Sequence, residues 1–337
     1  MAVSSNEEKG NLSCCVFNGD LLSSVLPPLL IVEFVLGVVG NGIALWIFCF
    51  HFKPWKTSTV FLFNLALADF LLNVILPFRT DYYLRNKDWI FGDVFCSISL
   101  FMLAMNRAGS ILFLTAVAVD RYFKVVHPHH LINTKSVTKA VYTACALWVL
   151  AIALTVYLLT KSHLFPNGNL TQCDSFTICL FSTSDGSWHN ALFVLEFCVS
   201  LSIVLYCSFS IAWKLKVNLL DKQARIRKAV KLVTVVVVMF VVCFLPSNVT
   251  RILIWIKNRK HIHDCAAYEA LDIGFYITIS LTYLNSMLDP LVYYFSSPTF
   301  KKYYIAVVSL RLHKKEDLSA EGTSDRDTTR TPSADRL

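Results

Sequence analysis

The stretch VTVVVVMFVVCFL, residues 233–245, runs for thirteen residues without a charged side chain. It lies within a longer, mainly apolar segment over 227–257. A helix needs roughly 20 such residues to cross the hydrocarbon core of a bilayer, and lipid offers the backbone no other hydrogen-bond partners. Six further segments of this kind occur in the chain. Together they predict an all-α membrane protein, a bundle of seven transmembrane helices near 25–50, 59–83, 94–125, 137–159, 189–216, 227–257 and 268–295.

The composition agrees with lipid as the main solvent. Hydrophobic residues make up 55% of the 337 residues, charged residues only 16%, and the mean hydropathy is +0.54. Soluble domains carry about 25% charged residues. The net charge of +8 is spread over short clusters between the apolar segments. This distribution is typical of membrane topology, so we expect the bilayer as a partner and no nucleic acid.

The Lys and Arg clusters also predict the orientation. They lie after the first, third and fifth segments and after the seventh, and the largest lies over 214–231. The positive-inside rule places these connections in the cytoplasm, and hence the N-terminus outside the cell at the plasma membrane. The first two dozen residues are polar and show no cleavable signal peptide. Two glycosylation sequons, at Asn11 and Asn169, fall on the outer side.

We therefore divide the chain into four parts. They are an extracellular N-terminus over 1–24, the bundle over 25–295, a short amphipathic helix on the membrane surface over 296–310, and a cytoplasmic tail over 311–337. The surface helix is predicted because aromatic side chains alternate there with Lys301 and Lys302. The tail is rich in Ser, Thr, Asp and Arg, a composition typical of disorder.

Two acids lie inside predicted membrane helices. A charge there costs at least about 2.5–3.5 kcal/mol on insertion scales, so each acid needs a partner. Asp69 in the second segment and Asp289 in the seventh lie at similar depth to the side-chain oxygens of Ser110, Asn285 and Ser286. These oxygens favour either a hydrated sodium site or a plain hydrogen-bonded polar cluster. The residues alone leave both interpretations equally open.

Arg107 is the most informative charge in the third segment. The run before it, over 100–106, contains no acid. A buried guanidinium without an acidic partner is suited to bind a ligand carboxylate through two parallel hydrogen bonds. The alternative is a salt bridge within the protein, to Glu196 in the fifth segment. We favour the ligand, because intramembrane charges commonly mark functional sites.

Arg79 and Arg251 lie near the outer ends of the second and sixth segments. Taken singly, each is explained by a side chain that extends to the membrane interface. Together with Lys161 they predict a positively charged mouth that attracts anions.

Six cysteines lie in polar stretches or at segment ends, an even number that predicts disulfides on the oxidising side of the membrane. Spacing alone leaves 15 pairings open. No cysteine or histidine has the spacing of a metal site, and no residues have a convincing catalytic arrangement, so we expect neither an enzyme nor a cofactor beyond possible sodium. A transporter is the other alternative, but the chain has no inverted repeat. The six are Cys14, Cys15, Cys96, Cys173, Cys179 and Cys265.

An ordered series of motifs resembles the rhodopsin-like G-protein-coupled receptors. They are GN at 40–41, LALAD at 65–69, DRY at 120–122, Trp148, CFLP at 243–246 and DPLVY at 289–293. Within that class the chain resembles the hydroxycarboxylic acid receptors, through CCVF at 14–17, FMLAMNR at 101–107, DRYFKVVHPHH at 120–130 and NSMLDP at 285–290. LPFRTDYY at 76–83 is most similar to the lactate-sensing member, whereas TYLN at 282–285 leans towards the receptors for oxo- and hydroxy-eicosanoids.

The resemblance implies a site and a signalling route. A ligand carboxylate would be held by Arg107 with Ser175 and Tyr283 as neighbours. The disulfides would be Cys96–Cys173, Cys14–Cys179 and Cys15–Cys265. Binding of a short acid such as lactate or 3-hydroxybutyrate, or alternatively of an oxidised fatty acid, would act through inhibitory G proteins to lower cyclic AMP. The inner switch would be Asp120, Arg121 and Tyr122, and arrestin and a receptor kinase would bind the tail.

One departure from the class bears on helix shape. Ser200 stands in the fifth segment where most members have a proline, so the bulge that this proline causes is in doubt.

Overall fold

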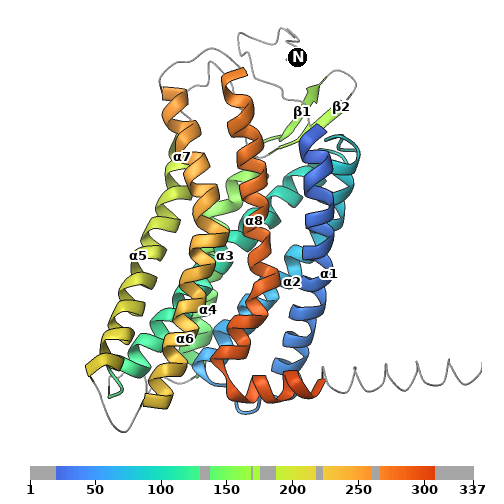
Figure 1. Ribbon diagram of the computed structural model, residues 1–337. Coiled ribbons are helices and arrows are strands. Elements are labelled where there is room, and N and C mark those ends of the chain that lie inside the picture. The colour runs from blue at the N-terminus through green and yellow to red at the C-terminus, as the bar shows by residue number, and fades with distance from the viewer. Residues whose placement is uncertain are drawn as a thin grey trace, which may run out of the picture.

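The computed structural model describes residues 20–129, 137–167, 170–174, 187–217, 223–259 and 266–307. Long helices run side by side, and a β-hairpin lies at one end of them (Figure 1). The helices are α1 (Asp20–Phe50), α2 (Thr57–Leu84), α3 (Asp93–Val126), α4 (Val137–Thr155), α5 (Ser187–Val217), α6 (Gln223–Met239), α7 (Leu245–Arg259) and α8 (Ala266–Ser296). A 3-10 turn, η2 (Val156–Leu159), extends α4, and the hairpin consists of β1 (Leu164–Asn167) and β2 (Leu170–Cys173).

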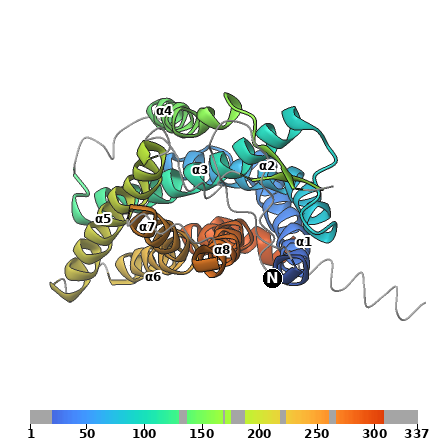
Figure 2. The same cartoon turned by 90° about the horizontal axis from the view of Figure 1, so that it is seen from above.

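The predicted seven-helix membrane fold is confirmed. A π-helical turn, η4 (Phe240–Phe244), joins α6 to α7, so these three elements form one rod. Six rods of the described chain are long and apolar enough to cross a membrane. The seventh, α8, has 31 residues but carries more acids and packs beside α1, α6 and α7 (Figure 2). α1 begins at Asp20 rather than at residue 25, because a helix can continue past the hydrocarbon into the polar interface.

The turn η4 is a feature that the sequence analysis did not predict. Pro246 has no backbone N–H, and its ring would clash with the carbonyl of residue 242 in a regular α-helix. A wider turn before the proline relieves this clash, as π-bulges do. Pro246 is the feature of the sequence from which this turn could have been predicted. α5, by contrast, runs as one α-helix through the buried Ser200, in keeping with the missing proline there.

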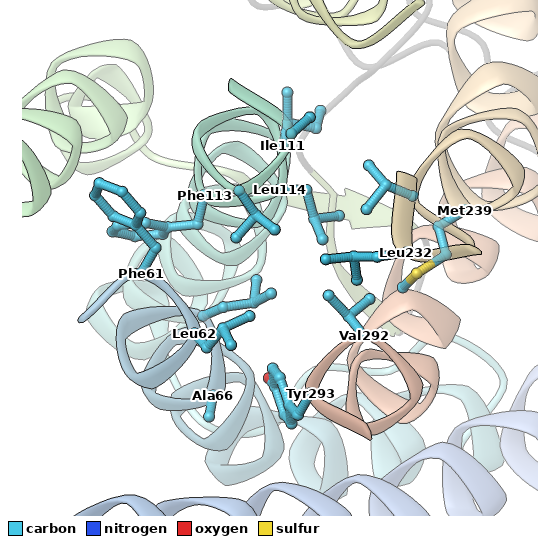
Figure 3. Packing of buried hydrophobic residues seen from close by; sticks show 14 of the residues in the cluster. Phe61, Leu62, Ala66, Ile111, Phe113, Leu114, Leu232, Met239, Val292 and Tyr293 are labelled. Carbon is cyan, nitrogen blue, oxygen red and sulfur yellow. The ribbon is translucent and has the colours of Figure 1, made fainter. Parts of the chain in front are cut away.

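The inner half of the bundle is packed with apolar side chains from α2, α3, α6 and α8. Leu114, Leu232 and Val292 point towards one another in Figure 3, and they are almost fully buried, as is Ile111. Large apolar side chains on the outside are exposed instead, for example Phe209, which is 68% exposed on α5. Such a surface is suited to lipid, because it leaves the polar groups inside the bundle.

Three motif residues lie where helices meet. A Cβ at Gly40 would lie 2.8 Å from Pro290 Cγ, so glycine permits the close approach of α1 to α8. Asn41 donates from Nδ2 to the backbone oxygen of Ser286, at 2.8 Å. The indole Nε1 of Trp148 in α4 donates to Asn64 Oδ1 of α2 at 2.8 Å.

The predicted surface helix is present over 298–307, across the end of the bundle (Figure 1). Phe300 anchors it, because its ring is buried 5.3 Å from the ring of Phe48 and 5.8 Å from that of Tyr293. Lys301 and Lys302 stay exposed. Residues 1–19 and 308–337 lie outside the described residues, so the four-part division of the chain remains a prediction.

Candidate functional site

A lid formed by the β-hairpin covers one end of the bundle. β1 and β2 pair antiparallel, and the predicted disulfide Cys96–Cys173 joins β2 to the first turn of α3. Trp89 donates its backbone N–H to the oxygen of Thr171 at 2.7 Å, which ties the α2–α3 connection to the hairpin. Burial lowers the pKa of His163 at the start of this lid, so its imidazole is neutral at neutral pH. The two other predicted disulfides, and the sequons, involve Cys14, Cys15, Cys179, Cys265, Asn11 and Asn169, which lie outside the described residues.

An ion pair that the sequence analysis missed lies under this lid. Lys87 Nζ lies 3.0 Å from Asp174 Oδ2, and both side chains are at most 7% exposed. Tyr82 donates its hydroxyl to Asp174 Oδ1 at 3.1 Å, and the ring of Tyr276 in α8 lies 4.7 Å below the ammonium. Asn86 and Lys87 have φ of 56° and 66°, a left-handed turn that directs the lysine inward. Sequence patterns do not reveal this turn, because neither residue is glycine.

A cavity opens at the same end of the bundle, between α1, α2, α3, α4, η2, α5, α7 and α8. Its free space, the open mouth included, is about 1060 Å³. Four of the five predicted ligand-binding residues line it, namely Arg79, Arg107, Arg251 and Tyr283, which come from four different helices. The fifth, Ser175, lies outside the described residues. The remaining wall is largely apolar, with leucines from α1 and α3 and aromatic rings from α5 and α8.

Arg107 has an acidic partner, contrary to our prediction from the sequence. Its Nη1 lies 3.1 Å from Glu196 Oε2, and the two side chains are 5% and 8% exposed. Nη2 also points to the backbone oxygen of Phe193 at 3.5 Å and to Asn248 Oδ1 at 3.4 Å, while the Phe193 ring lies 3.5 Å from the guanidinium carbon. The expectation failed because the acid is 89 positions away in the chain and faces α3 only in the folded bundle.

Arg79 and Arg251 lie inside the bundle, 5% and 7% exposed, so they do not extend to the membrane interface. Arg79 donates to the backbone oxygen of Cys173 at 2.9 Å and lies over the ring of Tyr82 at 4.9 Å. Arg251 donates from Nε to Asn190 Oδ1 at 2.9 Å. The interfacial alternative is therefore wrong for both. Three guanidiniums share a cavity in which Glu196 is the acid among the described lining residues.

A second polar cluster lies deeper, where α2, α3 and α8 meet. Asp69 Oδ1 accepts from Asn106 at 3.1 Å and Oδ2 accepts from Tyr293 at 3.2 Å, while Asp289 Oδ2 accepts from Asn285 at 2.8 Å. The two carboxyl groups lie within hydrogen-bonding reach of one another. Neither forms an ion pair within the described part of the chain.

Four buried oxygens in or next to this cluster have no hydrogen-bond donor in the described structure. They are Ser110 Oγ, Asn285 Oδ1, Ser286 Oγ and Asp289 Oδ1. Buried oxygens are normally satisfied, and a small hard cation binds such carboxylate, amide and hydroxyl oxygens. The residues predicted from the sequence, Ser286 included, thus fit a sodium ion. Asn106 and Tyr293, which contact Asp69, were not predicted.

At the opposite end, the predicted switch residues of α3 contact three other helices, α2, α5 and α8. Asp120 forms an ion pair with Lys124 at 2.7 Å and accepts from Ser58 at 2.7 Å, whereas Arg121 Nε lies 3.9 Å from it. Arg121 instead donates to Ser296 Oγ at the end of α8, at 2.6 Å. The hydroxyl of Tyr122 lies 3.1 Å from His127 Nε2 and 3.4 Å from the hydroxyl of Tyr206 in α5.

Comparison with known proteins agrees with this architecture. Residues 40–293 match the family model of the 7 transmembrane receptor (rhodopsin family). Hydroxycarboxylic acid receptor 1 of Homo sapiens is 54% identical, over 87% of this chain and 83% of its own length. Hydroxycarboxylic acid receptor 3 of Homo sapiens is 50% identical, over 94% and 80%.

The oxoeicosanoid receptor 1 of Homo sapiens is a more distant relative. It is 38% identical, over 92% of this chain and 79% of its own length. The bundle, its motifs and these similarities agree: the chain is a multi-pass membrane protein that belongs to the hydroxycarboxylic acid receptors within the rhodopsin family of seven-transmembrane receptors.

Proposed function

We propose that this receptor binds a short hydroxycarboxylic acid in the cavity at the lid end of the bundle and signals through inhibitory G proteins to lower cyclic AMP. One observation indicates that the ligand is negatively charged. Three arginines, Arg79, Arg107 and Arg251, line the cavity, and Glu196 is the acid among its described lining residues. An excess of buried positive charge favours an anion, and a guanidinium is suited to a carboxylate by its shape.

The ion pair with Glu196 already neutralises part of the charge of Arg107. A lone Arg107 would have pointed to an anion by itself, whereas a paired one does not. The preference of the cavity for an anion depends on the combined charge of the three arginines. A ligand carboxylate would lie between them and join the Arg107–Glu196 pair, with Tyr283 and Ser175 as hydrogen-bonding neighbours.

The names of the relatives favour a hydroxycarboxylic acid over an oxidised fatty acid. Proteins named hydroxycarboxylic acid receptors are 50–54% identical to this chain, against 38% for the oxoeicosanoid receptor. We therefore favour lactate, 3-hydroxybutyrate or a similar short acid over an oxidised fatty acid. The apolar walls from Leu26, Leu30 and Phe275 would contact the carbon chain.

A cyclic AMP assay in transfected cells tests the proposal. The panel contains lactate, 3-hydroxybutyrate, niacin and several eicosanoids, each with and without pertussis toxin, which uncouples inhibitory G proteins. We expect a hydroxy acid to lower cyclic AMP, and the toxin to remove the effect. Hydroxy acids without effect beside an active eicosanoid would contradict the proposed ligand class.

At the inner end, Asp120, Arg121 and Tyr122 would act as the switch. An agonist that binds the active helix arrangement more tightly shifts the population towards it. Release of Arg121 from Ser296 would then open a groove for the G protein between α3 and α8. We further propose that the N-terminus lies outside the cell, that Asn11 and Asn169 carry glycans, and that arrestin and a receptor kinase recognise the tail.

The deep cluster is proposed as an allosteric sodium site, with Asp69, Ser110, Asn285 and Asp289 as ligands. An ion bound only by the folded state stabilises it. In purified receptor, replacing potassium by sodium at constant ionic strength should raise the Tm by about 2–4 °C for each kcal/mol of binding.

The Asp69→Asn variant should lose this difference between the two salts, because it removes one ligand charge. Asp81→Asn, which changes an acid on the outer side of α2, should keep it. Equal melting of the parent in both salts would exclude the sodium site and leave a plain polar cluster.

A further inference from the structure

The Arg107–Glu196 pair leaves one buried atom of each partner without a hydrogen bond. Arg107 donates from Nη1 and Nη2, but its Nε has no acceptor in the described structure. Glu196 accepts at Oε2, but its Oε1 has no donor. Both residues line the cavity, and both atoms are buried. An unmade hydrogen bond on a buried charged group is costly, so one donor and one acceptor remain for a ligand.

A hydroxy acid supplies both complements from one small molecule. Its carboxylate accepts from Arg107 Nε, and its hydroxyl, one or two carbons away, donates to Glu196 Oε1. A plain carboxylic acid satisfies the arginine but places its charge beside an unpaired glutamate oxygen. An ammonium group would also donate to Glu196, but the two other guanidiniums, of Arg79 and Arg251, disfavour a cation here.

We propose that Glu196 recognises the ligand hydroxyl and is the residue by which the receptor prefers hydroxy acids over acids that lack the hydroxyl. The proposal rests on the proposed function and assigns a specificity role to the acid that pairs with Arg107. Tyr157 and Tyr283 also line the cavity. A carboxylate is the stronger acceptor, because charge-assisted hydrogen bonds are about twice as strong as neutral ones.

The test compares matched acids in the cyclic AMP assay: lactate with propionate, and 3-hydroxybutyrate with butyrate. A hydrogen bond to a charged group corresponds to about 10–100-fold in potency, and we expect the parent receptor to show this ratio. In Glu196→Leu the ratio should fall to within about 3-fold, because the acceptor is gone. The ratio cancels any effect that the substitution has on both acids alike.

Two further variants keep the test decisive. Glu196→Gln retains an oxygen for Arg107 and should fold even where the leucine variant does not; without the charge, its ratio should fall several-fold. Glu33→Leu removes a buried acid of α1 that does not line the cavity, so it should keep the parent's ratio. Antibody labelling of the cell surface normalises all variants.

The possible failures separate the two proposals. A parent that responds equally to lactate and propionate, or a Glu196→Gln or Glu196→Leu receptor that keeps the full ratio, would overturn the role of Glu196 while the carboxylate receptor stands. A parent that responds to none of the four acids would overturn the proposed function and this inference with it.

Discussion

Replacement of Arg107 by alanine is expected to lower the potency of the hydroxy acid at least about 30-fold in the cyclic AMP assay. Truncation of one partner of a buried charge pair costs about 2–5 kcal/mol or more, and 1.4 kcal/mol corresponds to a factor of ten. The variant would lose the contact with the ligand carboxylate, and it would also leave Glu196 buried without its cation. Both effects act in the same direction.

Two controls separate ligand binding from folding. Arg85→Ala removes an exposed arginine outside the cavity, 49% exposed, and should respond like the parent. Arg107→Ala combined with Glu196→Leu removes both charges, so its surface level should recover relative to Arg107→Ala while its potency stays low. If Arg107→Ala reaches the surface and responds with unchanged potency, Arg107 does not bind the ligand.

The second large effect concerns the lid. The Lys87→Met variant should lower the free energy of unfolding by about 3–5 kcal/mol, because Asp174 would remain buried beside Tyr82 without its cation. Asp174→Asn should lower the free energy of unfolding by a similar amount, since it leaves the buried Lys87 without its ion-pair partner. The double variant removes both charges and should recover most of the loss. Thermal unfolding of purified receptor measures all three.

The pair Arg85–Asp81 offers a matched comparison on the same side of the molecule. Its side chains are 49% and 35% exposed, and its atoms lie 2.7 Å apart. Exposed pairs contribute little, because water already solvates both charges. Arg85→Met should therefore have almost no effect on unfolding. A Lys87→Met receptor that unfolds like Arg85→Met would mean that the buried pair does not hold the lid.

The sequence by itself determined the fold, the family and four of the residues that line the cavity, Arg79, Arg107, Arg251 and Tyr283. Hydropathy is a local property of the sequence, so each apolar segment predicts a membrane crossing independently of the other segments. The motifs are equally local and contain Arg79 and Arg107, while Arg251 was found by its place at the end of an apolar segment. The turn at Phe240–Phe244 was the local feature overlooked, although Pro246 marks it.

Only the tertiary structure decided which charges are neutralised. Glu196 reaches Arg107, and Asp174 reaches Lys87, across 89 and 87 positions of the chain. Such pairs depend on the rotation of each helix about its axis and on loop turns such as the one at Asn86, neither of which leaves a periodic pattern. The Coulomb energy falls with the distance between groups in space, whereas the sequence orders them only along the chain.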